Sequence, residues 1–594
     1  MDRMGSTRRT FMAGAAAVGG TAALGSTGTA SAAGGTTVDG TAAAPSVAVL
    51  GGGVAGLTAA HELAERGFRV TVYERRALGG KARSMDVPGS AKGGRRPLPA
   101  EHGFRFIPGI YHNLPDTMRR IPFPGNANGV WDNLVAPPEM SFARTGREDL
   151  RIPLPWPGHK PADLTLDEIR RALTGALDTL KGIPAHETAY FVNRGLVFLT
   201  SCDERRDEAW ESTPWWEFIR AEQMSYDYQR VLAVGLTRNI VATKAEEAST
   251  RTVATLLEAF VFNALGRGAD GPLDRILNAP TNEAWIDPWV EHLTTLGVEF
   301  RIGWTVREVK YGGGRVTTAV IEDPQGSRQS VTADHYVSAM PVEHARRTWG
   351  PELRAADPQL VRCDKLETDW MTGIQFYLTE KAPLLHGHLN CIDSPWSLTA
   401  IQQADHWPSR DFPADYGDGV AVDCLSVDIS EWDRPGILYG KTAKQCTRTE
   451  VAREVWAQLK AAVNDTGATI LKDSALHSWF LDPGVDGIGT PNPTNQDELL
   501  IHPVGTFHNR PHAATRIPNF FLAGDYVAVD IDLATMEGAN ASARAAVNAL
   551  LDKTGSPAAR CTVKPLFRAP EIELMKRHDR TRYRLGLRNA FDLG

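Results

Sequence analysis

A glycine-rich turn between a strand-like segment and a helix-like segment constrains the fold of this chain most. The turn reads Gly-Gly-Gly-Val-Ala-Gly over residues 51–56, directly after the apolar residues 47–50. The residue pattern predicts a helix over residues 57–66, ended by Gly67, and a second short strand over residues 70–73. Strand, glycine turn, helix and strand in this order predict an α/β fold of the Rossmann type, in which such turns bind dinucleotides.

Each glycine of the turn has a separate physical role in such a site. Gly51 permits the tight turn, Gly53 lets the backbone approach a pyrophosphate, and Gly56 allows close packing of helix against strand. Val54 and Ala55 lie where the helix N-terminus offers free N–H donors and the positive end of its dipole. A glycine-rich turn without any ligand is the alternative, and the order of the flanking elements disfavours it.

The second strand ends in Glu74, about twenty residues after the turn, where a carboxylate accepts the ribose hydroxyls of an adenosine. A glutamate there disfavours NADP, because it repels the 2′-phosphate, but it does not separate NAD from FAD. The next segment, residues 78–84, resembles the second FAD motif of the FAD-dependent amine-oxidase and phytoene-desaturase superfamily. The alternative for its cations is solvated surface charge. The resemblance implies FAD contacts from Arg75, Gly79, Gly80, Lys81, Ala82 and Arg83.

The resemblance continues along most of residues 45–550. Residues 101–111 are similar to the stretch that passes the flavin in phytoene desaturases and hydroxysqualene dehydroxylase-like proteins, and residues 334–341 to the strand that closes the cofactor domain. In residues 305–309 the resemblance implies that the backbone of Val306 binds adenine. These motifs identify a cofactor and leave the substrate open.

The C-terminal signature combines residues 521–526 with residues 534–539. By resemblance, Asp525 binds the ribityl chain, and the following helix directs its N-terminal dipole at the flavin pyrimidine ring, where it stabilises negative charge. The alternative for Asp525 is a simple helix cap or turn residue. The residues assigned to FAD in this part of the chain are Gly524, Asp525, Thr535, Met536, Gly538 and Ala539.

The fold class that follows is α/β, with an amine-oxidase-like division into two domains. A Rossmann-type FAD-binding domain is assembled from distant segments, and a mixed α+β substrate domain is inserted between them. The predicted boundaries are a twin-arginine signal (1–32), a linker (33–44), FAD-binding segments (45–150, 281–345 and 496–552), a helical insert (151–280), a substrate domain (346–495) and a C-terminal arm (553–594).

The N-terminus is typical of an export signal. Arg8 and Arg9 precede a weakly apolar stretch over residues 11–24, and residues 30–32 read Ala-Ser-Ala, a small-residue cleavage pattern. Paired arginines of this kind resemble the twin-arginine signal, which implies export of an already folded protein to an extracellular, periplasmic or cell-surface location. A disordered basic N-terminus is the alternative. Because no later stretch approaches the ~20 apolar residues that span a bilayer, we expect a soluble or peripheral mature protein.

The predicted function is that of an FAD-dependent oxidoreductase, and the substrate class stays open. The first hypothesis is desaturating or dehydroxylating-type chemistry on an isoprenoid-like or other apolar substrate, by hydride transfer to flavin. The second is a secreted amine or amino-acid oxidase, and the third a non-catalytic FAD-binding electron-transfer protein. Outside the cell, either O2 or a membrane quinone has to reoxidise the flavin. The net charge of −7 provides no basic field for nucleic acid.

His102 and Arg105 are the catalytic candidates, because the resemblance runs their segment beside the flavin. Structural roles, a turn cap for His102 and an ion pair for Arg105, are the alternative. No metal site is predicted, and six scattered cysteines cannot be paired from sequence. The basic run over residues 576–584 predicts either contact with an anionic membrane surface or an arm packed against the protein.

Overall fold

The computed structural model describes residues 44–103, 106–154, 165–178, 181–384 and 386–592. The predicted export signal and nearly all of the predicted linker lie outside these residues, and so does Arg105. Within the described residues, no helix combines the length and apolar character needed to cross a membrane.

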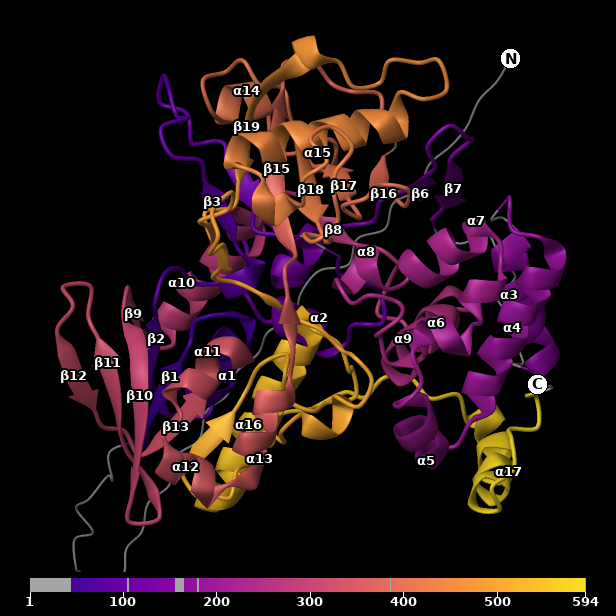
Figure 1. Cartoon of the computed structure of the whole chain (residues 1–594). Coiled ribbons are helices and arrows are strands. Elements are labelled where there is room, and N and C mark those ends of the chain that lie inside the picture. Colours follow the sequence, from indigo (N-terminus) through magenta and orange to yellow (C-terminus); the bar gives the residue numbers. More distant parts are fainter. Residues whose placement is uncertain (1–43, 104–105, 155–164, 179–180, 385, 593–594) are drawn as a thin grey trace, which may run out of the picture. The chain divides into compact units, whose positions relative to one another are not determined.

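A five-stranded parallel sheet is built from three separate stretches of the chain (Figure 1). The strands over residues 46–50, 335–338 and 520–522 are short and largely buried, as is typical of sheets covered on both faces, whereas the edge strand over residues 299–302 is mostly exposed. The helices α1 (Val54–Ala64) and α16 (Met536–Thr554) pack against each other beside this sheet. The strand order is β23 (Phe520–Leu522), β13 (His335–Ser338), β1 (Ser46–Leu50), β2 (Arg69–Glu74) and β9 (Glu299–Ile302).

The first helix, α1 (Val54–Ala64), begins three residues earlier than the sequence pattern predicts. Gly53 is its N-cap, and the helical hydrogen bonds start where the N–H of Leu57 donates to the carbonyl of Gly53 at 2.9 Å. A Cβ atom on Gly56 would lie 1.9 Å from the carbonyl oxygen of Gly51. Only glycine therefore fits at residue 56, and the helix packs directly against the turn.

A seven-stranded mixed sheet is the second large sheet of the protein, and α15 (Arg448–Val463) covers one of its faces (Figure 1). Val451, Val455 and Leu459 of α15 share a buried apolar cluster with the strands. The order is β19 (Leu476–Leu481), β15 (Thr372–Leu378), β18 (Asp423–Ile429), β17 (Thr399–Gln402), β16 (Gly387–Cys391), β6 (Glu139–Ala143) and β7 (Leu150–Pro153).

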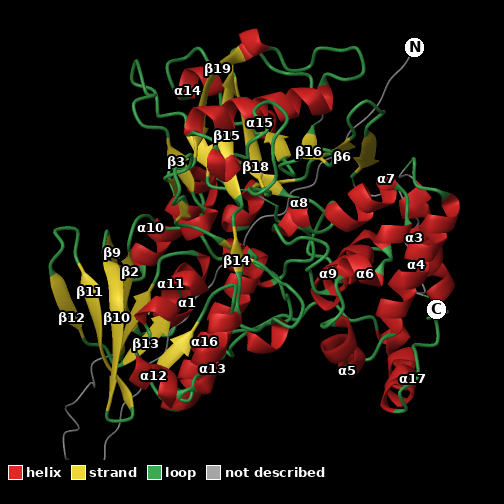
Figure 2. Ribbon diagram, viewed as in Figure 1, coloured by secondary structure: helices red, strands yellow, loops and turns green. Residues whose placement is uncertain are grey.

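A group of helices follows β7 in the chain, and the C-terminal helix α17 (Glu573–Arg584) packs against two of them (Figure 2). Asp579 of α17 holds it in place, because its carboxylate accepts hydrogen bonds from the Arg205 side chain and from the N–H of Cys202, each at 2.9 Å. The main helices of the group are α3 (Leu166–Asp178), α4 (Ala185–Thr200), α5 (Asp203–Arg205), α6 (Trp215–Phe218), α8 (Arg238–Val241) and α9 (Thr250–Ala264).

Shorter elements complete the part of the chain that the structure describes. An antiparallel three-stranded sheet, whose first strand is the predicted adenine-binding segment, extends from the parallel sheet. All six cysteines are buried and none forms a disulfide. Further elements are β4 (Pro99–Glu101), α2 (Asn113–Arg119), α10 (Asp287–Thr295), β10 (Thr305–Gly312), β11 (Arg315–Glu322), β12 (Arg328–Val331) and α16 (Met536–Thr554).

Candidate functional site

A cavity of about 980 Å³ opens where the parallel strands end. Gly51 follows β1, Arg75 follows β2, Ala339 follows β13 and Gly524 follows β23, and all four residues line the cavity. The crevice beyond the carboxyl ends of parallel strands is where open α/β sheets bind their ligands. The volume lies at the upper end of the range for small-molecule and cofactor sites.

The glycine turn gives the cavity a bare backbone wall. Gly51 has a φ of +113°, and a Cβ atom there would lie 2.7 Å from the carbonyl oxygen of Ala339. Gly80 has a φ of +57°, and its Cβ atom would lie 2.9 Å from the Cα atom of Gly53. A Cβ atom on Gly53 would meet only the Cα atom of Gly80, at 3.7 Å, so this glycine faces open space in the cavity.

Glu74 lies at the end of β2 with its carboxylate held by two backbone groups. The N–H of Gly52 donates to Oε2 and the N–H of Arg76 donates to Oε1, each at 2.8 Å. The side chain therefore has a fixed position beside the glycine turn while it still lines the cavity. A carboxylate in this place has remaining lone pairs for the hydroxyls of a ribose.

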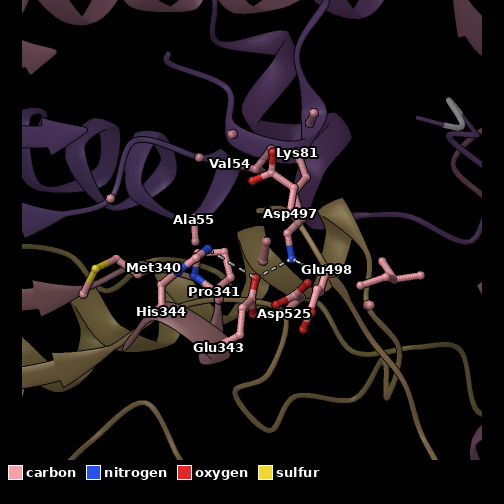
Figure 3. Close-up of a pocket in the computed structure, with 18 of the residues that line it drawn as sticks. Val54, Ala55, Lys81, Met340, Pro341, Glu343, His344, Asp497, Glu498 and Asp525 are labelled. Atoms are coloured by element: carbon pink, nitrogen blue, oxygen red, sulfur yellow. Dashed lines mark hydrogen bonds and ion pairs between the residues drawn. The ribbon is translucent and has the colours of Figure 1, made fainter. Parts of the chain in front are cut away.

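Cations and carboxylates from distant segments meet at one side of the cavity (Figure 3). Asp497 contacts Arg75 at 3.2 Å and Arg83 at 3.6 Å, and it also contacts Arg76. Burial alone would raise the pKa of Asp497, but the nearby cationic groups outweigh it and hold this pKa well below its usual range. The carboxylate is therefore ionised, and it fixes the loop over residues 493–499 against the predicted phosphate-binding residues.

Lys81 extends into the same group, where its ammonium contacts Glu343 at 3.1 Å and the carbonyl of Glu498 (Figure 3). Burial alone would lower the pKa of Lys81, but the carboxylates of Glu343, Asp525 and Asp497 outweigh it and raise this pKa. Lys81 therefore carries a positive charge inside the cavity. That charge and the arginines suit the phosphates of a dinucleotide.

The N-terminus of α16 points its first residues into the cavity. Thr535 is the N-cap, and its hydroxyl accepts the N–H of Gly538 at 2.9 Å, while Met536 and Ala539 line the cavity. Glu537 turns the other way: its carboxylate accepts the N–H of Asn113 and the N–H of Leu114 at the start of α2, each at 2.8 Å. The positive end of the α16 dipole thus remains available to a ligand.

His102 follows β4 and lines the cavity, with its ring fixed by a buried carboxylate. Its Nδ1 atom lies 2.5 Å from Oδ2 of Asp482, whose Oδ1 accepts the N–H of Gly484 at 2.6 Å. Burial would raise the pKa of Asp482, but the hydrogen bond and charge of His102 lower it. Asp482 is therefore the acceptor and Nδ1 the donor, so Nε2 is the ring nitrogen that remains to exchange a proton with a ligand in the cavity.

Another part of the cavity is lined by apolar side chains, which come from α8, α9 and the segments that precede β15 and α16. Phe106 and Phe260 lie with their ring centroids 5.9 Å apart, and Leu256 precedes Phe260 by one turn of α9. We call this region the apolar arm; it consists of Phe106, Ile240, Leu256, Phe260, Trp370, Met371 and Leu533. One continuous cavity therefore joins a polar, phosphate-suited part to an apolar arm.

Most residues that the sequence assigns to the site line this cavity, and two of the described ones do not. Gly56 packs behind the turn against Gly51, and Gly538 lies inside the first turn of α16. Arg105 lies outside the described residues. The assigned residues in the lining are His102, Gly51, Gly53, Val54, Ala55, Glu74, Arg75, Gly79, Gly80, Lys81, Ala82, Arg83, Val306, Gly524, Asp525, Thr535, Met536 and Ala539.

Sequence reasoning missed a second set of lining residues, some of them labelled in Figure 3. Met340 and Pro341 close a segment already noted as similar to the family, so attention to the strand end would have found them. Asp497 gives no such signal, because it meets Arg75 across 422 residues of sequence. The missed residues of the polar part are Arg76, Met340, Pro341, Glu343, His344, Asp497 and Glu498.

Among the described residues, one cluster away from the cavity has ligand types suited to a metal: His61, Glu65 and His292. Trp289 fixes the tautomer of His61 in this cluster, because the indole N–H of Trp289 donates to Nδ1 of His61 at 3.1 Å. The hydrogen of a neutral His61 then resides on Nε2, which donates to Glu65 at 3.0 Å. A metal at Nε2 would have to displace that hydrogen, so the cluster is explained as a hydrogen-bonded link between α1 and α10.

The profile of the flavin-containing amine oxidoreductases matches residues 54–551, which begin within the glycine turn and include most of the cavity lining and α16. The chain belongs to this family. It is an FAD-dependent oxidoreductase, and its α/β architecture is that of the family. The glycine wall, the buried cations and the α16 N-terminus are features of the cavity that fit FAD.

Sequence relatives and solved structures resemble the chain over most of its length. A carotenoid phi-ring synthase from Streptomyces griseus is 27% identical, over 87% of this chain and 89% of that protein. A zeta-carotene desaturase from Synechocystis is 25% identical, over 85% of this chain and 97% of that protein. The structure of cyclohexylamine oxidase from Brevibacterium oxydans covers 86% of this chain and 100% of its own, with a TM-score of 0.55 at 14% identity, and supports the fold alone.

Proposed function

We propose that this protein oxidises an isoprenoid-like, polyene-type substrate by desaturation. The observation that carries the proposal is the apolar arm, which is continuous with the polar part of the cavity. A hydrocarbon chain gains free energy on burial in such a lining, at roughly 25 cal/mol per Å² of apolar surface. Two of the sequence relatives carry carotenoid chemistry in their names, which agrees with an apolar substrate.

Desaturation removes a hydride from one carbon and a proton from its neighbour, so that a C=C bond forms. FAD, when bound, supplies the acceptor for the hydride. The proton needs a base, and Nε2 of His102 is our candidate, since Asp482 fixes the ring through Nδ1 and stabilises the imidazolium that results. Lys81, Arg75 and Arg83 line the polar part of the cavity and would hold the phosphates of the cofactor.

Amine oxidation is the second candidate function, and the resemblance to cyclohexylamine oxidase favours it at the level of the fold. The two functions differ in what reduces the flavin. We therefore expect polyenes in detergent micelles to bleach, under anaerobic conditions, the flavin absorbance band near 450 nm. A panel of amines and amino acids should not bleach it. Bleaching by amines alone would establish the oxidase function instead.

A matched pair of variants connects the expected bleaching to the apolar arm. Phe260→Ser introduces a hydroxyl into the arm, whereas Phe567→Ser changes a phenylalanine that makes an edge contact with Phe262 on the opposite side of α9. We expect the first variant to weaken polyene-dependent bleaching about tenfold or more and the second to leave it within about threefold, on the scale of 1.4 kcal/mol per tenfold. Equal effects of both variants would indicate that the arm does not hold the substrate.

We further propose export by the twin-arginine route, supported by the residue pattern of the N-terminus. The six unpaired cysteines agree with it, because a protein that folds before export acquires no disulfides in a reducing cytoplasm. The test is an Arg8→Lys, Arg9→Lys variant, which we expect to remain in the cell while the parent chain is recovered outside the cytoplasm with residues 1–32 removed. Unchanged export of the variant would contradict the proposal.

A further inference from the structure

The C-terminal helix α17 exposes an apolar and cationic face that its packing leaves uncovered. Leu574 and Leu585 are 77% and 70% exposed, the highest values among the large apolar side chains of the described residues. At 100° per residue, Leu574, Arg577, His578, Thr581 and Leu585 project within about 60° of one direction. We call these five residues, with the exposed Leu587 and Arg588 that follow them, the α17 face.

The charge of this region is opposite to that of the whole chain. Residues 553–594 contain ten Lys or Arg and four Asp or Glu, a formal charge of +6, in a chain of formal charge −7. Acidic side chains neutralise part of it: Glu573 contacts Arg577 at 3.5 Å, and Glu204 contacts Arg580 at 2.8 Å and Arg584 at 3.1 Å. A cationic excess remains around the exposed leucines.

Leucines flanked by cations on one helix face have the composition of a segment that lies on an anionic lipid surface. We propose that the α17 face docks this protein on an anionic bilayer, with its leucines at the headgroup boundary and its cations on the phosphates. The family profile ends at residue 551, before this face begins.

The opposite side of α17 connects the docking face to the cavity. Lys576 lies 3.7 Å from Glu258 of α9, and Glu258 also contacts Arg206 at 2.6 Å. Leu256 and Phe260 of the same helix line the apolar arm. A single helix therefore separates α17 from the arm. This arrangement brings the arm near the membrane for a lipid-soluble substrate, a consequence that rests on the proposed function, whereas the docking does not.

The test is flotation of the protein with lipid vesicles. It uses the full chain and a chain lacking residues 1–43, which retains the compact unit of residues 44–594 and removes any contribution of the export signal. We expect both to float with vesicles that contain phosphatidylglycerol, and to float at least fivefold less with pure phosphatidylcholine vesicles or at high salt. Absence of flotation, or equal flotation with both lipids, would overturn the proposal.

Variants locate the contact on α17. Leu574→Asp with Leu585→Asp should lower flotation at least tenfold, and Arg577→Gln with Arg588→Gln should lower it severalfold. The matched control is Ile302→Asp with Val361→Asp, which changes two apolar side chains that are about half exposed elsewhere. An unchanged melting temperature checks that each variant is folded. Loss of flotation in the control alone would place the membrane contact outside the α17 face. A parent dimer that the leucine variant converts to a monomer in size exclusion would show that the α17 face binds a second copy of the protein.

Flavin reduction separates this proposal from the proposed function. The leucine variant should be reduced by a polyene in detergent at the parental rate, and several times more slowly when the polyene is dissolved in vesicles. If no polyene reduces the flavin while flotation behaves as described, the docking stands and the substrate assignment fails. Parental rates from vesicles in a variant that no longer floats would show that docking does not deliver substrate.

Discussion

The substitution Gly53→Ala separates cofactor binding from folding in this protein. Gly53 has a φ of −76°, which alanine adopts without strain, and its Cβ atom would lie 3.7 Å from its nearest protein neighbour, an ordinary contact. Alanine is a weaker N-cap than glycine, but it also restricts the unfolded chain, and the two effects offset each other to within about 1 kcal/mol. The apoprotein should therefore keep its stability.

The loss of FAD-binding free energy should be larger than this change in stability, because the new methyl group lies on the wall that a pyrophosphate has to approach. Loss of one charge-assisted backbone hydrogen bond costs about 1.5–3 kcal/mol. A weaker interaction with the α1 dipole adds about 0.3–1 kcal/mol. Together these terms give about 2–4 kcal/mol, or a roughly 30- to 700-fold higher dissociation constant for FAD.

The assay is titration of the apoprotein with FAD, followed by flavin fluorescence quenching, beside thermal unfolding of the apoprotein. Gly89→Ala is the control, because Gly89 has a φ of +71° and a Cβ atom there would meet nothing within 4 Å. The control should lose about 1–2 kcal/mol of stability and keep its FAD affinity. Unchanged FAD affinity in Gly53→Ala would refute the assignment of this wall to the pyrophosphate.

Three further outcomes follow from buried groups. Asp482→Asn should destabilise the protein by about 1.5–3 kcal/mol at neutral pH. Because the pKa of Asp482 is lowered in the folded state, the difference in unfolding free energy between variant and parent should disappear as the pH falls below its ordinary value of 3.8. Glu537→Gln places an amide against the N–H groups of α2 and should cost about 1.5–3 kcal/mol in chemical denaturation, whereas the exposed Glu573→Gln should cost under about 0.5. Burial raises the pKa of the Cys363 and Cys391 thiols to about 12, so native protein at pH 8 should react with a chromogenic disulfide reagent only after unfolding.

The sequence predicts well what is local in the chain. The glycine turn, Glu74 and the α16 N-terminus each combine a residue motif with adjacent strand or helix periodicity, and the structure places all three at one cavity. The start of α1 was predicted three residues late, because the apolar periodicity begins at Leu57 whereas the helical backbone begins at the glycine N-cap. The boundaries of the domains and the roles of the individual site residues stay predictions.

What the sequence leaves out are contacts between segments far apart in the chain. Asp497 reaches the arginines after β2, and Asp482 reaches His102 across 380 residues. Neither acid belongs to a local motif. Each meets its partner only because the two sheets and their connections pack together. The apolar arm has the same origin, since Leu256 has the periodicity of any buried helical residue until the fold brings Phe106 and Trp370 to the same cavity.

The most direct test of the account is a single anaerobic turnover with stoichiometric FAD-loaded protein and a polyene in detergent micelles. We expect one flavin reduced for each substrate molecule that loses two hydrogen atoms, measured by flavin absorbance and product mass in the same sample. Flavin reduction without loss of hydrogen from the polyene, or reduction by an amine that is converted to its imine instead, would contradict the desaturation that the cavity supports.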